Sequence, residues 1–283
     1  MLLFLIILTT FLFGFFFTPI LIRFSIKKKF YKNISKRDIH SYNIPNIGGV
    51  SIFLSFTIGF LLISSFYNEL FIENIQYHIY FLLSCFFMFL IGLYDDVFNV
   101  SFIYKFILQF ILAFFFVYLF DIKIESFYGL FGLFEFSYTF LKLFSVLVFV
   151  FIMNSYNLID GVDGLASSIG IFINLIFGLI FYKNCSYFDF SLSILLVVCL
   201  VSFFYYNKPN AKIFMGDSGS LFIGFLISYL SIKACNLPID NSGTINPVII
   251  LCILSYPSID TIRIFSLRIF KGNSPFKPDR NHI

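Results

Sequence analysis

The chain consists of apolar runs of about twenty residues that recur from one end to the other, with short polar stretches between them. A run of this length is long enough to cross the apolar part of a bilayer as an α-helix. We therefore expect an all-α polytopic membrane protein, folded as a single transmembrane domain over residues 1–283. The nine predicted helices are Leu2–Ile22, Ile47–Tyr67, Ile79–Tyr94, Phe102–Phe120, Phe140–Tyr156, Ala166–Tyr182, Leu192–Tyr206, Ser220–Ala234 and Pro247–Phe265.

Composition excludes the main soluble classes. Apolar residues make up 59% of the chain and charged residues 12%, whereas soluble domains carry about 25% charged residues. So few charges leave no polar coat for a surface in water. This excludes a soluble globular protein, a disordered chain, a coiled coil and a nucleic-acid binder that uses a basic face.

The basic residues predict which way the chain crosses the membrane. With the N-terminus outside, all but four of the 19 Lys and Arg residues lie inside; the four are Lys123, Lys142, Lys183 and Lys233. Because positive residues gather in cytoplasmic loops, we expect an external N-terminus and a cytoplasmic C-terminus. On the outer side, the alternating pattern of Asp121–Tyr138 around two glycines predicts a short β-hairpin.

The acidic residues also sort by side. All glutamates fall outside, whereas every acid predicted to lie inside is an aspartate: Asp38, Asp95, Asp96, Asp160, Asp163, Asp217, Asp260 and Asp279. Mg²⁺ prefers oxygen ligands and is commonly held by one or two carboxylates together with substrate phosphates. Short carboxylates beside lysines therefore indicate a metal and phosphate site on the inner face.

The predicted third helix ends on Asp95 and Asp96. Two adjacent carboxylates at a helix C-terminus are opposed by the helix dipole and by each other, so that a cation or a proton must compensate. Lys105 and Gln109 follow one turn apart on the next predicted helix. We interpret this segment as functional rather than as packing.

A second polar segment separates two apolar runs. Asn154, Asn157, Asp160 and Asp163 follow one another at intervals of three residues. In a helix this spacing places them along one face. The two Asp-Gly steps instead favour a turn whose side chains converge on a pocket, and the sequence leaves both arrangements open.

A third segment leads into the predicted eighth helix through two lysines and the run Gly-Asp-Ser-Gly-Ser. We expect the helix N-terminus here to offer free backbone N–H groups to a phosphate, with Asp217 placed to hold a bridging metal. Ser218 as a nucleophile is the competing interpretation, but no Ser-His-Asp arrangement supports it. Arg280 and His282, near the end of the chain, are candidates for contact with a pyrophosphate.

Four segments carry a resemblance to a known family: "GLYDD", "NSYNLIDGVDGLA", "AKIFMGDSGS" and "PFKPDRNH". Together they resemble the polyprenyl-phosphate N-acetylhexosamine-1-phosphate transferases. The wording of the second and third segments is closer to the N-acetylglucosamine-1-phosphate branch than to the pentapeptide branch. The likeness runs from about Arg37 to His282.

The resemblance implies a reaction and a place in the cell. A phosphate oxygen of undecaprenyl phosphate attacks the β-phosphorus of a UDP-N-acetylhexosamine, which releases UMP and starts a cell-envelope polysaccharide. The metal is Mg²⁺, with Mn²⁺ as an alternative. The protein is expected in the bacterial inner membrane, with its active site on the cytoplasmic face.

The motifs and the resemblance together give each candidate residue a role. Catalytic roles fall to Asp95, Asp96 and Asp217, metal binding to Asn157 and Asp217, nucleotide binding to Asn157, Asp160, Asp163 and Phe214, and binding of phosphate or lipid to Lys105, Lys212, Arg280 and His282. A phosphate monoester with a second pKa of about 6 is already mostly dianionic at neutral pH. No general base is therefore obligatory, and direct in-line displacement is favoured over a covalent aspartyl intermediate.

Other interpretations remain open at this stage. The family's histidine motif normally continues beyond the position of His282, so we expect the chain to be truncated at its C-terminus. The alternatives are a phospho-N-acetylmuramoyl-pentapeptide transferase and, from a different class, a membrane transporter or an inactive scaffold. The sequence leaves the donor sugar and the oligomeric state open, a homodimer included.

Overall fold

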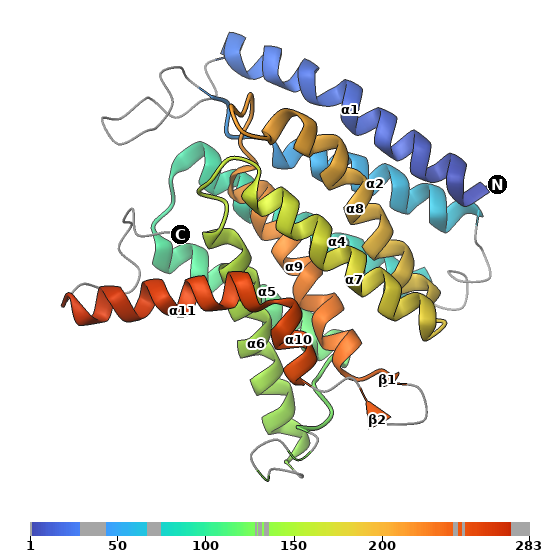
Figure 1. Ribbon diagram of the computed structural model, residues 1–283, viewed down its shortest axis with the longest axis vertical. Helices are drawn as coiled ribbons and strands as arrows, with labels where there is room; N and C mark the ends of the chain where they lie inside the picture. The colour runs from blue at the N-terminus through green and yellow to red at the C-terminus, as the bar shows by residue number, and fades with distance from the viewer. Residues whose placement is uncertain are drawn as a thin grey trace.

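The computed structural model describes residues 2–28, 44–66, 75–127, 129, 132, 136–239, 243–244 and 247–272. Its helices are α1 (Leu2–Lys28), α2 (Gly49–Phe66), α4 (Ile75–Phe98), α5 (Phe102–Leu119), α6 (Tyr138–Leu158), α7 (Leu165–Lys183), α8 (Tyr187–Asn207), α9 (Gly216–Cys235), α10 (Pro247–Ile253) and α11 (Ser255–Phe270) (Figure 1). Two short strands, β1 (Pro238–Ile239) and β2 (Gly243–Thr244), pair antiparallel.

The predicted all-α polytopic fold is confirmed. Within the described residues, eight helices are long and apolar enough to cross a membrane, and up to nine if α10 and α11 form one bent span. Large apolar side chains stand on the outer surface of the bundle; Ile103 on α5 and Leu179 on α7 are 67% and 65% exposed. Such a surface suits lipid rather than water.

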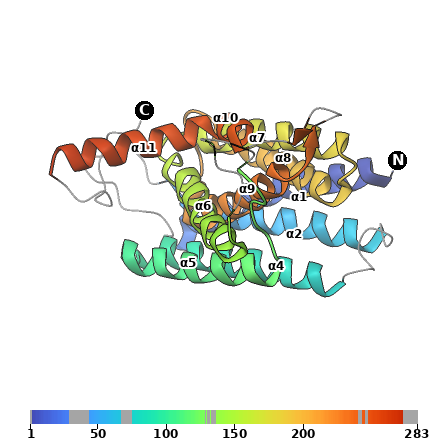
Figure 2. The same ribbon diagram turned by 90° about the horizontal axis from the view of Figure 1, so that it is seen from below.

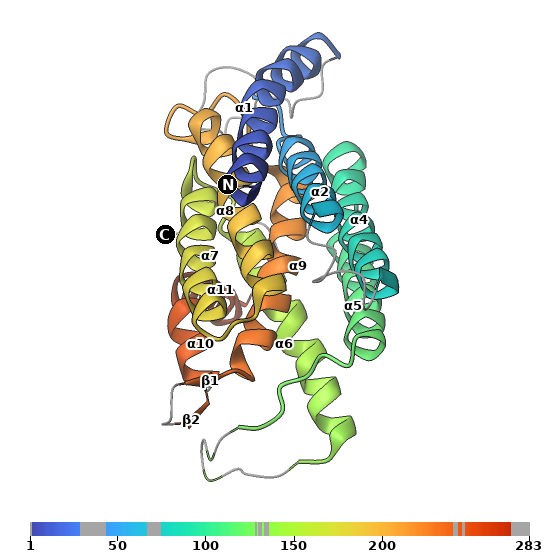
Figure 3. The ribbon, with the colours of Figure 1, turned by 90° about the vertical axis from the view of Figure 1, so that its right-hand side faces the viewer.

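The bundle is organised around α9. Seen from below, α4 and α5 form one side and α7, α10 and α11 the other, with α9 and α6 between them (Figure 2). The side view also places α9 inside the bundle (Figure 3), and its described side chains are buried except those of Asp217 and Lys233. Because neighbouring helices enclose α9 along its length, they hold its first turn in place at the end of the bundle where α4 ends. We call this the site end.

A proline inside α1 shows how the bundle keeps its backbone satisfied. Pro19 lacks an N–H, so the carbonyl of Phe15 loses its usual partner within the helix. The hydroxyl of Tyr206, on α8, donates to this carbonyl at 3.0 Å. A neighbouring helix therefore supplies the missing hydrogen bond, which is how prolines are tolerated in membrane spans.

The predicted ninth helix is broken into two. It was expected to run unbroken over Pro247–Phe265, but the chain bends by 82° between α10 and α11. Pro257 has no N–H to donate to the carbonyl of Ile253, which removes one helical hydrogen bond at the break. The next bond is present: Ser258 N–H donates to the carbonyl of Leu254 at 3.1 Å.

Two parts of the predicted topology stay predictions. The side of the membrane on which each end lies depends on the charge pattern alone. Most of the turn of the hairpin expected in Asp121–Tyr138 falls outside the described residues. The strand pair β1–β2 belongs to a different segment, directly after α9.

Candidate active site

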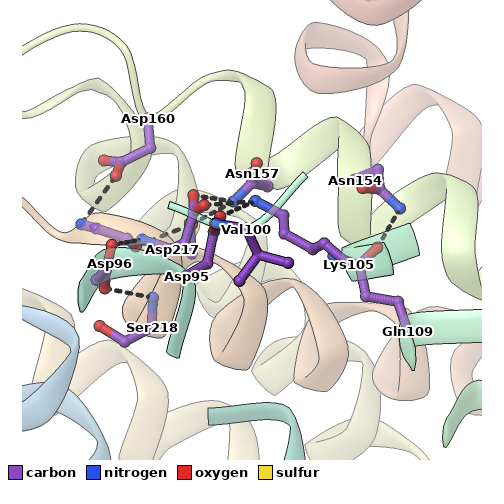
Figure 4. A network of polar contacts seen from close by, with 12 residues as sticks. Asp95, Asp96, Val100, Lys105, Gln109, Asn154, Asn157, Asp160, Asp217 and Ser218 are labelled. Atoms are coloured by element: carbon purple, nitrogen blue, oxygen red, sulfur yellow. Dashed lines mark hydrogen bonds and ion pairs between the residues drawn. The ribbon is translucent and has the colours of Figure 1, made fainter. Parts of the chain in front are cut away.

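Four helices bring four polar side chains together at the site end, with Asp95 on α4, Lys105 on α5, Asn157 on α6 and Asp217 on α9 (Figure 4). The Lys105 ammonium donates to Asp95 Oδ2 at 2.9 Å and also to Asp217 Oδ2. Asn157 Nδ2 donates to the other Asp217 oxygen at 2.8 Å. Lys105 therefore draws two carboxylates from distant parts of the chain toward one point.

The turn between α4 and α5 fixes the Asp95 carboxylate. Asn99 ends α4 with φ 51°, a left-handed conformation that turns the chain sharply. The backbone N–H of Val100 then donates to Asp95 Oδ1 at 2.7 Å. One carboxylate oxygen of Asp95 is thus held by the turn, and the other faces Lys105.

The start of α9 is capped by two carboxylates from other segments. Asp96 accepts the N–H of Asp217 at 2.8 Å through Oδ1 and that of Ser218 at 2.9 Å through Oδ2. Asp160 Oδ2 accepts the N–H of Gly216 at 3.1 Å. Our expectation that the N–H groups here are free to bind a phosphate is therefore wrong for these three residues.

The asparagine and aspartate segment uses both of the arrangements that the sequence left open. α6 continues through Asn154 and Asn157, whereas Asp160 and Asp163 lie in the turn before α7. One turn deeper in the bundle than Asn157, Asn154 Nδ2 donates to Gln109 Oε1 at 2.9 Å. In the helical part, Asn154 thus contacts α5 and Asn157 contacts α9. The turn part contacts the start of α9 and the segment before it.

The segment before α9 is pinned on both sides. Asp163 Oδ2 accepts the N–H of Ala211 at 3.0 Å. Phe214 donates its N–H to the carbonyl of Pro45 at 2.9 Å and accepts from the N–H of Gly48 at 3.0 Å. Asp163 and Phe214 therefore belong to the same rim of the site end, and the side chain of Lys212 is exposed there.

Some candidate residues lie outside the polar cluster, and one residue in it was missed. Asp38, Arg280 and His282 fall outside the described residues. Asn46 was not among the candidates, yet its Nδ2 donates to Asp96 Oδ1 at 3.0 Å. Its position two residues before the Gly48-Gly49 pair at the start of α2 was the available signal.

The site end gathers several carboxyl groups. Asp95, Asp96, Asp160 and Asp217 gather there, and in the part of the chain that the structure describes the Lys105 ammonium contacts two of them, Asp95 and Asp217. Burial raises the pKa of Asp160 well above its usual range, and the carboxylates of Asp217 and Asp96 raise it further. Carboxyl groups crowded in this way favour binding of a proton or of a cation.

The donor set fits Mg²⁺. Oxygens of Asp95 and Asp217 converge on one ammonium, and the amide group of Asn157 lies beside Asp217, to which its Nδ2 donates. Among the described residues, no three or more His, Cys, Asp or Glu side chains form a ready-made metal cage. Mg²⁺ commonly takes one or two carboxylates and completes its shell with water and substrate phosphates.

The chain is similar to known proteins. The model of glycosyl transferase family 4 matches residues 78–235. A probable undecaprenyl-phosphate N-acetylglucosaminyl 1-phosphate transferase of Bacillus subtilis is 31% identical over 94% of this chain and 72% of its own length. Undecaprenyl-phosphate alpha-N-acetylglucosaminyl 1-phosphate transferases of Thermotoga maritima (28% identical, 95% of this chain, 76% of the relative) and Yersinia pestis (27%, 96% and 73%) are also similar.

Proposed function

Because the chain belongs to glycosyl transferase family 4, we propose that it transfers N-acetylglucosamine 1-phosphate from UDP-N-acetylglucosamine to undecaprenyl phosphate. The names of its relatives support the acceptor and the sugar phosphate. The observation that carries the proposal is the convergence of Asp95, Lys105, Asn157 and Asp217 at one end of a membrane bundle. One end of a membrane bundle lies at the boundary between lipid and water, where a lipid phosphate and a water-soluble nucleotide can meet.

The reaction needs positioning and charge neutralisation more than covalent chemistry. A phosphate oxygen of the lipid forms a bond to the β-phosphorus of the nucleotide, and the bond from that phosphorus to the bridging oxygen breaks. The electron pair leaves with UMP. The lipid phosphate is already mostly dianionic at neutral pH, so the residues of this chain need not remove a proton from it.

Each polar residue of the site has a role in this scheme. Lys105 contacts the phosphates, and its ammonium stabilises the negative charge that moves toward UMP. Asp217 and Asn157 hold Mg²⁺, which when bound neutralises the diphosphate. Asp95 orients the Lys105 ammonium through its 2.9 Å contact. Asp163 and Phe214 line the entry for the uridine on the rim of the site end.

We place the site on the cytoplasmic face of a bacterial inner membrane. Arg23, Lys27 and Lys28 lie at the end of α1, and Lys208 and Lys212 lie in the segment that leads into the first turn of α9. Basic residues next to membrane spans favour the cytoplasmic side. UMP is then released where the donor nucleotide is available.

Transfer of radiolabelled sugar phosphate tests the proposal. Membranes that contain the protein are incubated with labelled UDP-N-acetylglucosamine and undecaprenyl phosphate, with Mg²⁺ or with EDTA, and the lipid product and UMP are measured. We expect equal amounts of the two products, formed only with the metal. No transfer from this donor, or transfer only from the UDP-linked muramoyl pentapeptide, would overturn the proposal.

A matched pair of variants ties the activity to the site. Asp217→Asn removes a charge from the first turn of α9, and Asp189→Asn makes the same change in the first turn of α8. Asp189 is buried away from the site, where it accepts hydrogen bonds from Tyr229 and Ser186. We expect Asp217→Asn to abolish transfer and Asp189→Asn to retain it at equal protein level.

A further inference from the structure

We infer that the two adjacent aspartates at the end of α4 have different tasks, and that Asp96 is a positioning residue that holds the start of α9 so that Asp217 faces the site. The part of this inference that concerns the reaction rests on the proposed function. Asp95 shares Lys105 with Asp217. Both oxygens of Asp96 are instead used on backbone N–H groups of α9.

The start of α9 needs a cap from another segment because it cannot supply its own. The preferred N-cap residues accept an N–H of the first turn through a side-chain oxygen. Gly216 has no side chain, and Met215 before it makes no such bond. A larger residue does not fit at Gly216, since its φ is +73° and a Cβ there would lie 2.7 Å from Asp96 Oδ2. Asp96 provides both acceptors from α4.

The contact also resolves the unfavourable placement of an acid at the end of a helix. The dipole of α4 opposes a negative charge at its C-terminus, whereas the dipole of α9 favours one at its N-terminus. The Asp96 carboxylate lies between the C-terminus of α4 and the N-terminus of α9. Its oxygens are 2.8 Å and 2.9 Å from the backbone nitrogens of Asp217 and Ser218. Asn46, from the segment before α2, donates to it at 3.0 Å and fixes its orientation.

The same contact controls where Asp217 points. Asp217 donates its backbone N–H to Asp96, and its side-chain carboxylate contacts Lys105 and Asn157. A change in the direction of this first turn would therefore move the Asp217 oxygens relative to the other two groups. Asp96 acts on the reaction through Asp217, and it does not itself contact the lipid phosphate.

The first test measures the backbone directly. Hydrogen–deuterium exchange of the purified protein is followed by mass spectrometry in peptides that cover residues 214–222, without substrate. We expect Asp96→Asn to speed exchange there by about 2- to 30-fold, the range given by loss of a helix cap, because its amide accepts only one of the two N–H groups. Asp189→Asn is the matched control and should leave these peptides unchanged. Unchanged exchange in Asp96→Asn would overturn the inference.

The second test separates positioning from contact with the lipid. In Asp96→Asn we expect kcat to fall and the Mg²⁺ concentration for half-maximal transfer to rise, with the KM for undecaprenyl phosphate within about twofold of wild type. Excess Mg²⁺ should recover part of the activity. A KM for the lipid raised about tenfold, with an unchanged Mg²⁺ requirement, would instead place Asp96 against the lipid phosphate.

A milder variant protects the test against misfolding. Asn46→Ala removes the 3.0 Å donor to Asp96 and leaves the carboxylate in place. It should shift both readouts in the same direction by a smaller factor, and no shift in either would count against the inference. The exchange experiment needs no turnover. If the wild-type protein fails to transfer the sugar phosphate, the proposed function fails while the cap is still tested.

Discussion

Gly92 is the residue of α4 that allows the helix to touch the first turn of α9. A Cβ built at Gly92 lies 2.5 Å from the carbonyl carbon of Asp217 and 2.6 Å from Cα of Ser218. Carbon atoms in contact prefer a separation of about 3.5 Å, and both neighbours are backbone atoms that no rotamer change can move. In Gly92→Ala, α4 and α9 must therefore separate by about 1 Å.

Two consequences follow from that separation. Overpacking of this kind costs about 1–3 kcal/mol, which is only partly offset by the gain of up to about 1 kcal/mol from replacing a helical glycine with alanine. Displacement of a catalytic group by about 1 Å can lower kcat by about 100-fold. Asp217 lies on the displaced turn. We therefore expect Gly92→Ala to lower kcat strongly while the free energy of unfolding falls only slightly.

The matched control is the same substitution in α7. A Cβ at Gly178 lies 3.4 Å from Cδ1 of Ile194, an ordinary contact with a flexible side chain. Gly178→Ala should keep wild-type transfer and an equal or higher melting temperature in detergent. Transfer rates and melting curves of both variants are measured at equal protein level. A Gly92→Ala protein with wild-type kcat would refute the claim that close contact between α4 and α9 sets the site geometry.

Three further changes test other parts of the molecule. Lys105→Met leaves two carboxylates without their shared cation, so we expect transfer to fall by at least about 100-fold and stability by about 3 kcal/mol; normal transfer would contradict its role. Tyr206→Phe removes the donor to the Phe15 carbonyl and should cost about 1–3 kcal/mol, seen as a lower melting temperature with kcat unchanged. A hydrogen bond from Lys142 lowers the pKa of Asp121 to about 2, below its value of about 3.9 in an unfolded chain. The stability that Asp121 contributes is therefore complete above about pH 4 and lost as the pH falls toward about 2; Asp121→Asn should remove this part of the acid dependence, and equal melting profiles from pH 6 to pH 3 would contradict it.

The helices could be predicted from sequence because membrane insertion depends on local apolar length. Eight of the predicted runs coincide with α1, α2 and α4 to α9, with ends that differ by several residues in places. The bend before α11 was missed although Pro257 is visible in the sequence. A proline removes one hydrogen bond from a helix. Whether the helix then continues or the chain bends by 82° depends on which helix the following segment packs against. α11 packs against α6.

The sequence indicated most of the side chains that cluster at the site end, but not their individual contacts. Asp95 and Asp96 are marked as two adjacent acids at the end of an apolar run, and Asp217 as an acid between Gly216 and Ser218 before the next run. The partner of each carboxylate depends on how closely distant segments approach. Asp96 and Ser218 lie 122 positions apart and meet only because α4 packs against α9. Asp95 and Asp96 are adjacent and identical in type, so the sequence predicted one role for both. In the structure they contact different groups: Asp95 contacts Lys105, and Asp96 contacts the start of α9.

The four carboxyl groups at the site end differ in what holds them, and this decides which of their contacts can change when a substrate binds. Those of Asp96 and Asp160 are held by backbone N–H groups at the start of α9, which cannot move without moving a buried helix. Those of Asp95 and Asp217 are held by Lys105, whose ammonium stands on a flexible stem. An incoming diphosphate can therefore draw the ammonium toward itself without any helix shifting. Asp96 and Asp160 keep the start of α9 in place. In the proposed reaction, Asp217 then offers its oxygens to the cation when the Lys105 ammonium turns to the substrate.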